Sequence, residues 1–219
     1  MFKGVLFDLD GVIADTSTLH FDAWKKLVNN YFSAKLPDSL EEKTKGVSRG
    51  DSLKVILNYL DVSVSDTMFQ RLLVEKNQTY LASLENLSIK DRLPGITEFI
   101  TELKQHEIKL ALASASLNGP AILDKLELRD AFEAIADPSK VPYGKPAPDI
   151  FIAAAKALEL NPRDCVGIED SSAGITAINH SGAYSVAVGT HPELKAANML
   201  LASTAELNLD TIRQAYPHN

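Results

Sequence analysis

The sequence predicts an α/β protein: a doubly wound, mostly parallel sheet core with an inserted all-α helical cap domain. Short apolar runs alternate with helical patterns through most of the 219 residues, as strand–helix–strand units require. By contrast, residues 16–92 are almost entirely helical in pattern and contain no convincing strand. The length fits a core with one smaller insertion. We therefore expect residues 1–15 and 93–219 to form the core and residues 16–92 the cap.

The predicted strands are short continuous apolar runs. Runs of this kind are typical of strands that are buried on both faces of a parallel sheet. They lie at residues 5–9, 109–113, 165–168 and 184–188.

Helical segments are predicted between these strands. Residues 119–126 form one, with a proline at its second position. Residues 148–158 form another, opened by a proline suited to the first helical position. A third begins after Ser171–Ser172, and Gly182 closes it.

The predicted cap begins with an amphipathic helix. One face of this helix carries His20, Trp24, Leu27, Val28 and Tyr31. A capping box formed by Ser48 and Asp51 then opens a second helix over residues 49–60. The chain returns to the core near residues 93–95, whose sequence is Leu-Pro-Gly.

Composition limits the class of protein. The chain is 45% hydrophobic and 23% charged, as ordinary globular proteins are. Its formal net charge of −7, with no basic cluster, argues against a nucleic-acid partner. Nothing in the sequence marks an interface, so we expect a monomer.

The N-terminus and the cysteine content indicate the compartment. Asp8 and Asp10 interrupt the first apolar run, which therefore does not fit a signal peptide. No run approaches the roughly 18 apolar residues of a membrane helix. With Cys165 as the single cysteine, no intramolecular disulfide can form. We expect a cytoplasmic protein without a membrane span.

Polar residues follow the predicted strands where each strand ends. Because ligands of open α/β sheets bind beyond the carboxyl ends of the strands, these residues are expected to share one site. They are Asp8, Asp10 and Gly11 after the first strand, Ser114, Ala115 and Ser116 after the second, and Glu169 and Asp170 after the third. Lys145 lies in a Gly/Pro-bounded loop before a helix.

Each of these residues also has a purely structural interpretation. Asp10 could belong to a turn, Ser114 could cap a helix, and Glu169 and Asp170 could favour a helix dipole. Lys145 could be a solvated loop residue. All of these interpretations would have to hold together, at one sheet edge, which makes a shared function the better explanation.

The residue types fit phosphoryl transfer. A carboxylate such as Asp8 can attack phosphorus and form an aspartyl phosphate, which divides one transfer into two. Asp10 projects to the same side, two residues along, and can give and take the proton of the leaving or attacking hydroxyl. Crowded carboxylates need a divalent cation, and Asp8, Glu169 and Asp170 offer the hard oxygens that Mg²⁺ prefers.

The remaining polar groups would bind the transferring phosphoryl group. Lys145, the Ser114 hydroxyl and the backbone N–H of Ala115 can hold its oxygens, where negative charge is carried in the transition state.

Taken in order, these motifs resemble those of the haloacid-dehalogenase superfamily. The matching segments are Asp8-Leu9-Asp10-Gly11, Ser114-Ala115-Ser116, Lys145-Pro146 and Glu169-Asp170-Ser171. The likeness is greatest to its β-phosphoglucomutase family, through FDLDGVIADT, KGVSR at residues 45–49, ALASAS and KPAPDIF. That family interconverts β-glucose 1-phosphate and β-glucose 6-phosphate through β-glucose 1,6-bisphosphate.

The resemblance assigns roles. It implies that Asp8 is the nucleophile and Asp10 the acid/base. It implies that Mg²⁺ is held by Asp8, the Asp10 carbonyl, Glu169 and Asp170. Thr16 and His20 would lie near the hinge between core and cap, where His20 couples cap closure to acid/base chemistry.

The resemblance also implies which residues bind the substrate, a small sugar phosphate. Lys45, Gly46 and Arg49 of the cap, with Ser116 and Asn118 of the core, would engage the sugar or its non-transferring phosphate. His20 and Trp24 would face the substrate as well. On pattern alone, Lys45 and Arg49 could be a solvated helix junction, and His20 and Trp24 could be core residues.

Two positions depart from the family pattern. Leu117 stands where a polar or basic residue is expected beside the distal phosphate, and Thr44 where an aliphatic residue is expected. A related hexose phosphate is therefore conceivable as substrate.

Two other functions remain open at this point. The first is a sugar-phosphate phosphatase of the same superfamily, which would share every core residue. Lys45, Gly46, Arg49 and His20 argue against it. The second is a non-catalytic sugar-phosphate-binding protein, but binding alone requires no nucleophile with its own acid/base.

Overall fold

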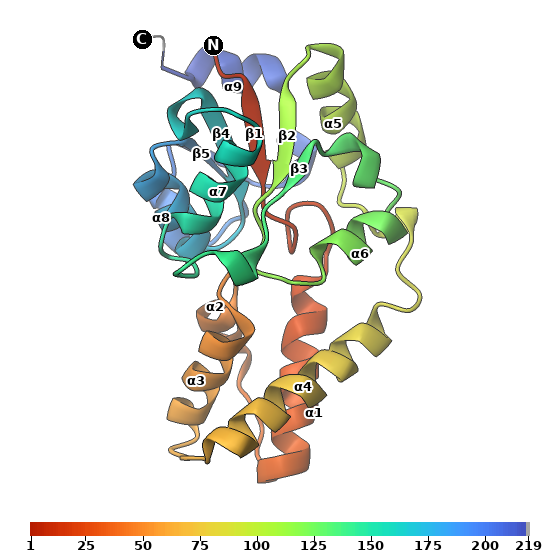
Figure 1. Cartoon of the computed structure of the whole chain (residues 1–219), viewed down its shortest axis with the longest axis vertical. Coiled ribbons are helices and arrows are strands. Elements are labelled where there is room, and N and C mark those ends of the chain that lie inside the picture. The colour runs from red at the N-terminus through yellow and green to blue at the C-terminus, as the bar shows by residue number, and fades with distance from the viewer. Residues whose placement is uncertain (218–219) are drawn as a thin grey trace.

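A six-stranded, wholly parallel sheet forms the centre of the computed structural model, which describes residues 1–217. The strand order is β3-β2-β1-β4-β5-β6 (Figure 1). The strands are β1 (Gly4–Phe7), β2 (Lys109–Leu112), β3 (Ala134–Ile135), β4 (Cys165–Glu169), β5 (Tyr184–Val188) and β6 (Met199–Leu201). The predicted α/β class and its parallel sheet are confirmed.

The predicted strands are those at the centre of the sheet. In register, Phe7 of β1 lies opposite Leu112 of β2 and Ile168 of β4. β1 ends at Phe7, two residues earlier than predicted, so that Asp8 already belongs to the loop beyond the strand. The edge strands β3 and β6 were missed, because elements of two and three residues give no recognisable apolar run.

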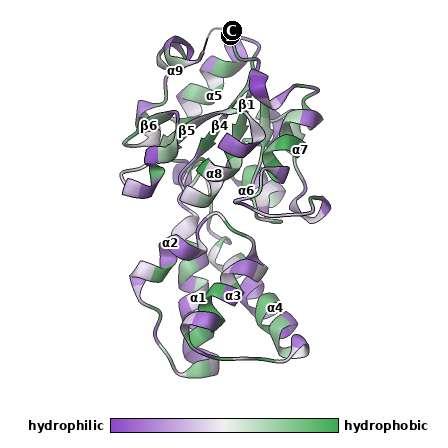
Figure 2. Ribbon diagram, turned by 90° about the vertical axis from the view of Figure 1, so that its left-hand side faces the viewer, coloured by the Kyte–Doolittle hydropathy of each residue, from purple (hydrophilic) through white to green (hydrophobic). Residues whose placement is uncertain are grey.

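Helices cover both faces of the sheet. They are α5 (Ile96–Gln105), α6 (Gly119–Lys125), α7 (Asp149–Ala157), α8 (Ser172–Ser181) and α9 (Leu209–Ala215). Alternate strand residues point to opposite faces: Phe7 packs with α5, α6 and α9, whereas Leu6 packs with α7 and α8. Figure 2 shows hydrophobic central strands beneath helices of mixed polarity.

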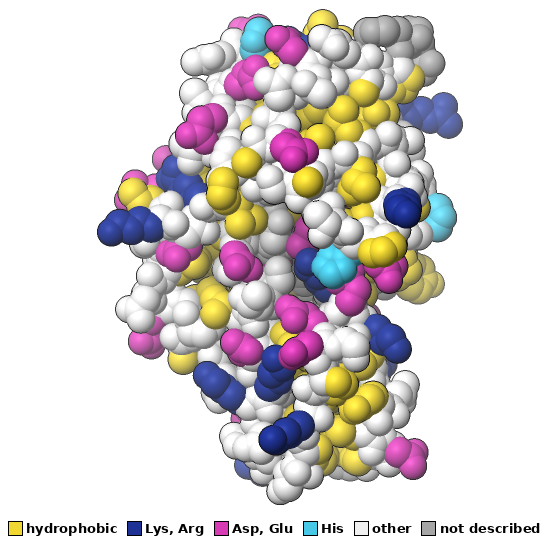
Figure 3. Space-filling model, turned by 180° about the vertical axis from the view of Figure 1, so that it is seen from behind, with side chains coloured by type: hydrophobic (Ala, Val, Ile, Leu, Met, Phe, Trp, Pro, Cys, Tyr) yellow, Lys and Arg dark blue, Asp and Glu magenta, His cyan; other side chains and the backbone are white. Residues whose placement is uncertain are grey.

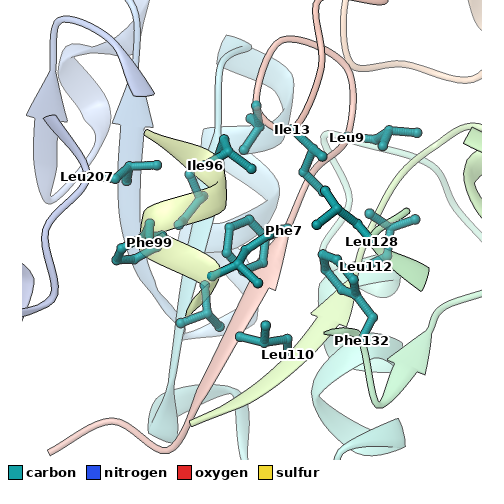
Figure 4. Close-up of a cluster of buried hydrophobic side chains, with 14 of the residues drawn as sticks. Phe7, Leu9, Ile13, Ile96, Phe99, Leu110, Leu112, Leu128, Phe132 and Leu207 are labelled. Atoms are coloured by element: carbon teal, nitrogen blue, oxygen red, sulfur yellow. The ribbon is translucent and has the colours of Figure 1, made fainter. Parts of the chain in front are cut away.

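Aromatic packing anchors β1 on one face of the sheet. The ring of Phe7 meets those of Phe99 and Phe132 edge-on, with centroids 6.2 and 5.7 Å apart (Figure 4). Such tilted pairs add favourable electrostatics to the burial of apolar surface. This packing fixes the end of β1 and, with it, the backbone position of Asp8, the next residue.

The ends of the core helices follow from their capping residues. Ser171 accepts a hydrogen bond from the Gly174 amide at the start of α8, and Gly182 closes that helix with φ 88°. The prediction for α7 was wrong in detail. Pro148 is the N-cap and Asp149 the first helical residue, since the Pro148 carbonyl accepts the first hydrogen bond of the helix, from the Ile152 amide. The helix ends at Ala157, one residue earlier than predicted.

The four helices between β1 and α5 lie beyond the carboxyl ends of the strands (Figure 1). They are α1 (Ser17–Phe32), α2 (Glu41–Thr44), α3 (Arg49–Tyr59) and α4 (Asp66–Ser83), and are called the helical region below. This region has its own hydrophobic cluster, which includes Trp24, Leu27 and Val28 of the predicted α1 face. His20 and Tyr31 lie half-buried at the margin of that face.

Ser48 is the N-cap of α3, as predicted, but the Asp51 carboxylate bonds to its hydroxyl and not to its backbone amide, so the reciprocal half of the predicted capping box is absent. Ser48 Oγ accepts a hydrogen bond from the Asp51 amide at 3.1 Å and donates one to the Asp51 carboxylate at 2.6 Å. The helix begins at Arg49, as predicted, and ends one residue early at Tyr59.

The chain leaves and re-enters the core through paired segments. The Leu93 amide donates to the Ile13 carbonyl at 2.9 Å, and Ala14 forms an antiparallel bridge with Arg92. Both connections to the helical region therefore run side by side. Among the described residues, no helix is long and apolar enough to cross a membrane.

Truncation of Leu112 tests the burial of the central sheet. Leu112 is 1% exposed on β2, so Leu112→Ala should lower the free energy of unfolding by about 2–5 kcal/mol, because it leaves a cavity. Leu200→Ala is the matched control, since Leu200 is 45% exposed on β6 and its truncation should cost less than about 1 kcal/mol. Urea unfolding of both variants measures the difference, and equal losses would contradict the assigned burial.

Candidate active site

The strand ends bring the predicted residues of the core together. Asp8 follows β1, and its amide donates to the Ile168 carbonyl of β4 at 3.0 Å. Glu169 ends β4 and Asp170 follows it. Ser114 lies two residues beyond β2. All four side chains are buried at the edge of the sheet that faces the helical region.

Lys145 is the centre of a buried ion cluster. Its Nζ lies 2.6 Å from Asp8 Oδ1 and 2.7 Å from Glu169 Oε2, and its side chain has no exposed surface. The other oxygen of Glu169 accepts hydrogen bonds from the Asp170 amide and from the amide and hydroxyl of Ser171. Buried charges are tolerated when they are paired and hydrogen-bonded in this way.

The cluster shifts the pKa values of its members. Burial raises the pKa of Asp8 to about 7; the Glu169 carboxylate adds to this rise and Lys145 opposes it. Burial alone would lower the pKa of Lys145, but the carboxylates of Asp8 and Glu169 outweigh it and raise that pKa. Lys145 therefore stays charged and supports the ionised form of Asp8.

Three carboxylates could hold a metal ion. Asp8, Glu169 and Asp170 each offer an oxygen within 4.8 Å of the others. Asp170 Oδ1 is buried and has no hydrogen-bond partner among the described residues, which leaves it available to a ligand. An all-oxygen, anionic donor set fits a hard divalent cation such as Mg²⁺.

The loop after β2 is held by its own hydroxyl groups. Ser114 Oγ accepts from the Ser116 amide at 3.0 Å, and Ser116 Oγ accepts from the Asn118 amide at 3.2 Å. Asn118 also reaches the helical region, where its Nδ2 donates to Asn77 Oδ1 of α4 at 3.1 Å. The loop is thus held by hydrogen bonds within itself and to α4.

Asp10 is oriented by two residues that the sequence placed near the hinge. Thr16 Oγ1 donates a hydrogen bond to Asp10 Oδ1, and His20 Nε2 lies 3.7 Å from Asp10 Oδ2. Thr16 is buried, whereas Asp10 and His20 retain some exposure. Asp10 is therefore held in place while its side chain still lines the cavity described below.

Sequence reasoning missed the residues of α4 that support His20. Lys76 Nζ is hydrogen-bonded to His20 Nδ1, and the Tyr80 ring stacks on the imidazole at 3.7 Å. A signal did exist, because Leu72, Lys76 and Tyr80 are spaced four residues apart and form the buried face of α4. A lysine within such a buried row needs an explanation beyond packing.

These neighbours suppress charge around the imidazole. Burial lowers the pKa of His20 to about 4; Lys76 and Arg49 lower it further, and Asp10 opposes them. Burial also lowers the pKa of Lys76 to about 7, and Arg49 contributes. His20 is therefore neutral at pH 7.

The loop between α2 and α3 touches the core directly. Lys45 Nζ lies 2.7 Å from Asp170 Oδ2. Gly46 adopts φ 71° and approaches Ser171 so closely that a Cβ at this position would collide with the Ser171 hydroxyl. Both the left-handed backbone and the close approach require glycine here.

A cavity of about 310 Å³ lies between the core and the helical region. Among the predicted site residues it is lined by Asp8, Asp10, His20, Trp24, Lys45, Gly46, Arg49, Ala115 and Ser116. The departing positions Thr44 and Leu117 also line it. Thr16, Ser114, Asn118, Lys145, Glu169 and Asp170 lie outside its wall, where they contact the lining residues or their neighbours. Seen from behind, the surface is hollowed near this junction, with charged side chains around the hollow (Figure 3).

The fold and this site define the class of protein. The family described as haloacid dehalogenase-like hydrolase matches residues 2–182, and the chain belongs to that family. Within it, the chain is 39% identical over 216 residues to the β-phosphoglucomutase of Bacillus subtilis (strain 168), covering 98% of this chain and 95% of that protein.

A solved structure and a further relative agree with this placement. The crystal structure of β-phosphoglucomutase from Clostridium difficile superposes with a TM-score of 0.95 at 40% identity, covering 99% of this chain and 97% of that one. A phosphorylated carbohydrates phosphatase from Thermotoga maritima is 29% identical over 182 residues, 82% of each protein. The predicted resemblance is confirmed.

The buried Lys76 makes stability depend on pH. Its pKa is about 7 in the folded protein against 10.5 in the unfolded chain, so between these values the unfolded chain binds a proton that the native state has released. The free energy of unfolding should therefore rise with pH above 7. We expect wild type to gain about 2 kcal/mol more than Lys76→Met between pH 7 and 9.

Chemical denaturation at several pH values measures this gain. Lys54→Met is the matched control, because Lys54 is a largely exposed lysine of α3. Its profile should follow wild type. Parallel profiles for wild type and Lys76→Met would show that Lys76 titrates normally.

Proposed function

We propose that this protein interconverts β-glucose 1-phosphate and β-glucose 6-phosphate through an aspartyl phosphate on Asp8 and a β-glucose 1,6-bisphosphate intermediate. The observation that carries the proposal is that residues of the core and of the helical region line the same cavity. The core contributes Asp8 and Asp10, and the helical region contributes Lys45 and Arg49. Similarity to two β-phosphoglucomutases over nearly the whole chain supports it.

Asp8 is the nucleophile of the proposal. Its carboxylate faces the cavity, and the Lys145 ammonium at 2.6 Å stabilises the negative charge that attack on phosphorus requires. Lys145, the Ser114 hydroxyl and the Ala115 amide then bind the transferring phosphoryl oxygens. These groups already lie beside Asp8. Ser114 and Ala115 follow β2, and Lys145 is held by the ion cluster.

Mg²⁺ is the proposed cofactor, held by Asp8, Glu169, Asp170 and the Asp10 carbonyl. When bound, it neutralises charge between the crowded carboxylates and the phosphoryl group. The buried acidic cluster and the unpartnered Asp170 Oδ1 support this assignment.

Asp10 is the proposed acid/base. It takes the proton from the attacking sugar hydroxyl and returns it to the leaving hydroxyl, which requires a carboxylate in hydrogen-bond reach. The Thr16 hydroxyl and the neutral His20 imidazole orient it. Because Thr16 and His20 sit at the start of α1, the position of Asp10 depends on the position of the helical region.

Residues 16–92 are the proposed cap, and residues 1–15 and 93–219 the proposed core. Arg49, at the first turn of α3, would bind the non-transferring phosphate, since a helix N-terminus and a guanidinium both favour anions. Lys45, Gly46, Ser116 and Asn118 would complete the sugar-phosphate site beside Trp24. We further propose a monomeric, cytoplasmic enzyme whose partner is this small sugar phosphate.

A phosphatase is the second candidate, because several relatives at 26–31% identity carry phosphatase names. It would share Asp8, Asp10 and Lys145 and release the phosphate to water. Higher identity to β-phosphoglucomutases favours the mutase.

What separates the two activities chemically is the preference for sugar over water. Well-oriented groups reach effective molarities on the order of 10⁵ M or more, which is enough to outcompete water.

Arg49→Ala tests the mutase proposal against its rival. Loss of the phosphate contact should lower the rate of glucose 6-phosphate formation by about 100-fold or more, because closure no longer depends on the distal phosphate. Hydrolysis of the phosphoenzyme, which needs no distal phosphate, should change far less. The measured quantity is the ratio of glucose 6-phosphate formed to inorganic phosphate released.

Arg71→Ala provides the control, since Arg71 is an exposed arginine of α4 that pairs with Glu75. It should keep the wild-type ratio. If wild type itself releases phosphate as fast as it isomerises the sugar, the protein is a phosphatase.

A further inference from the structure

Lys45 and Asp170 form an ion pair across the junction of core and helical region. Lys45 ends the turn after α2, and its Nζ lies 2.7 Å from Asp170 Oδ2. The two side chains are only 18% and 7% exposed, so little water separates the charges. The contact therefore holds the loop between α2 and α3 against the core.

The same carboxylate belongs to the acidic cluster. Asp170 lies with Asp8 and Glu169 in the set of oxygens that would bind a cation. Its Oδ1 is buried without a hydrogen-bond partner among the described residues, while its Oδ2 meets Lys45. Gly11 packs against this carboxylate, where a Cβ would collide with it, so Asp170 has little room to rotate away.

A second cavity gives access to this carboxylate. It measures about 310 Å³ and lies beyond the ends of β5 and β6, with Gly11, Lys45, Asp170, His191 and Ser203 in its lining. Lys45 lines both cavities, whereas Asp170 lines only this one. A hydrated cation can thus approach Asp170 while the α2–α3 loop is still closed on the core.

We propose that Lys45 and a divalent cation compete for Asp170, so that metal binding releases the α2–α3 loop from the core. The inference rests on the metal site of the proposed function. Two cations that share one poorly solvated carboxylate repel each other, and each weakens the binding of the other. This coupling is reciprocal. The factor by which the Lys45 contact lowers the affinity for metal is the factor by which bound metal lowers the equilibrium constant for loop closure.

The competition gives the loop a place in the reaction cycle. Without metal, Lys45 neutralises Asp170, and the cavity between the core and the helical region is closed. With metal bound, the loop is freed and the cavity opens to the sugar phosphate. The negative charge of the entering phosphoryl group then offsets the repulsion, so that Lys45 and the metal can both be present in the closed complex.

Binding of Mn²⁺ to the sugar-free protein, measured by electron paramagnetic resonance of free Mn²⁺, tests the proposal. Lys45→Met should bind Mn²⁺ on the order of tenfold more tightly than Lys54→Met. Lys54→Met is the matched control, because it removes the same charge from an exposed site on α3 and lacks contact with the acidic cluster. Lys45→Arg keeps the charge and should bind Mn²⁺ as wild type does.

Equal or weaker binding by Lys45→Met than by Lys54→Met overturns the inference and leaves the metal site intact. If Mn²⁺ binds none of the four proteins, the metal site of the proposed function fails together with the inference.

Hydrogen exchange provides the reciprocal measurement. Mg²⁺ should accelerate exchange of the amides of residues 44–50 in wild type and in Lys54→Met. In Lys45→Met these amides should exchange rapidly with or without Mg²⁺. Slower exchange of this loop in wild type on addition of Mg²⁺ would show that metal closes it, which contradicts competition.

Discussion

The contact of Lys145 with Asp8 and Glu169 is the constraint on which the site depends. An ammonium group with no exposed surface stands between two buried carboxylates. Removal of the ammonium or of a carboxylate would leave an uncompensated buried charge and lower the free energy of unfolding by about 3–5 kcal/mol. The sequence between β3 and α7 must therefore bring its lysine back to the ends of β1 and β4. Stability of the core and placement of the nucleophile are set by the same three side chains.

The helical region meets the core around this cluster at separate points, each at the end of a different strand. His20 reaches Asp10 beyond β1, Asn77 reaches Asn118 beyond β2, and Lys45 and Gly46 reach Asp170 and Ser171 beyond β4. A displacement of the helical region therefore changes the surroundings of the proposed acid/base and of a proposed metal ligand together. Proposed chemistry in the core and closure of the region above it are coupled through contacts, with no need for a distant signal.

Local signals explain what could be predicted from the sequence. The central strands, the Ser48 cap and Gly182 were recognisable, because apolar runs and capping residues act within a few positions. Asp8, Ser114, Glu169 and Asp170 were recognisable because they follow strands of a parallel sheet. The spacing of α4 marks Lys76 and Tyr80 as buried, but it assigns neither them nor Asn77 to the site, since their partners are 41 to 60 residues away in the sequence. The contact of Lys45 with Asp170 likewise depended on tertiary structure.

Identification of the phosphorylated residue tests the central claim most directly. Wild type quenched during turnover of β-glucose 1-phosphate with bisphosphate primer should carry a phosphate on the peptide that contains Asp8, as mass spectrometry can detect. Asp8→Asn keeps the shape of the side chain and should show no phosphate and less than about a thousandth of wild-type turnover, with an unchanged far-UV spectrum. A phosphate on another residue, or substantial turnover by Asp8→Asn, would contradict the account.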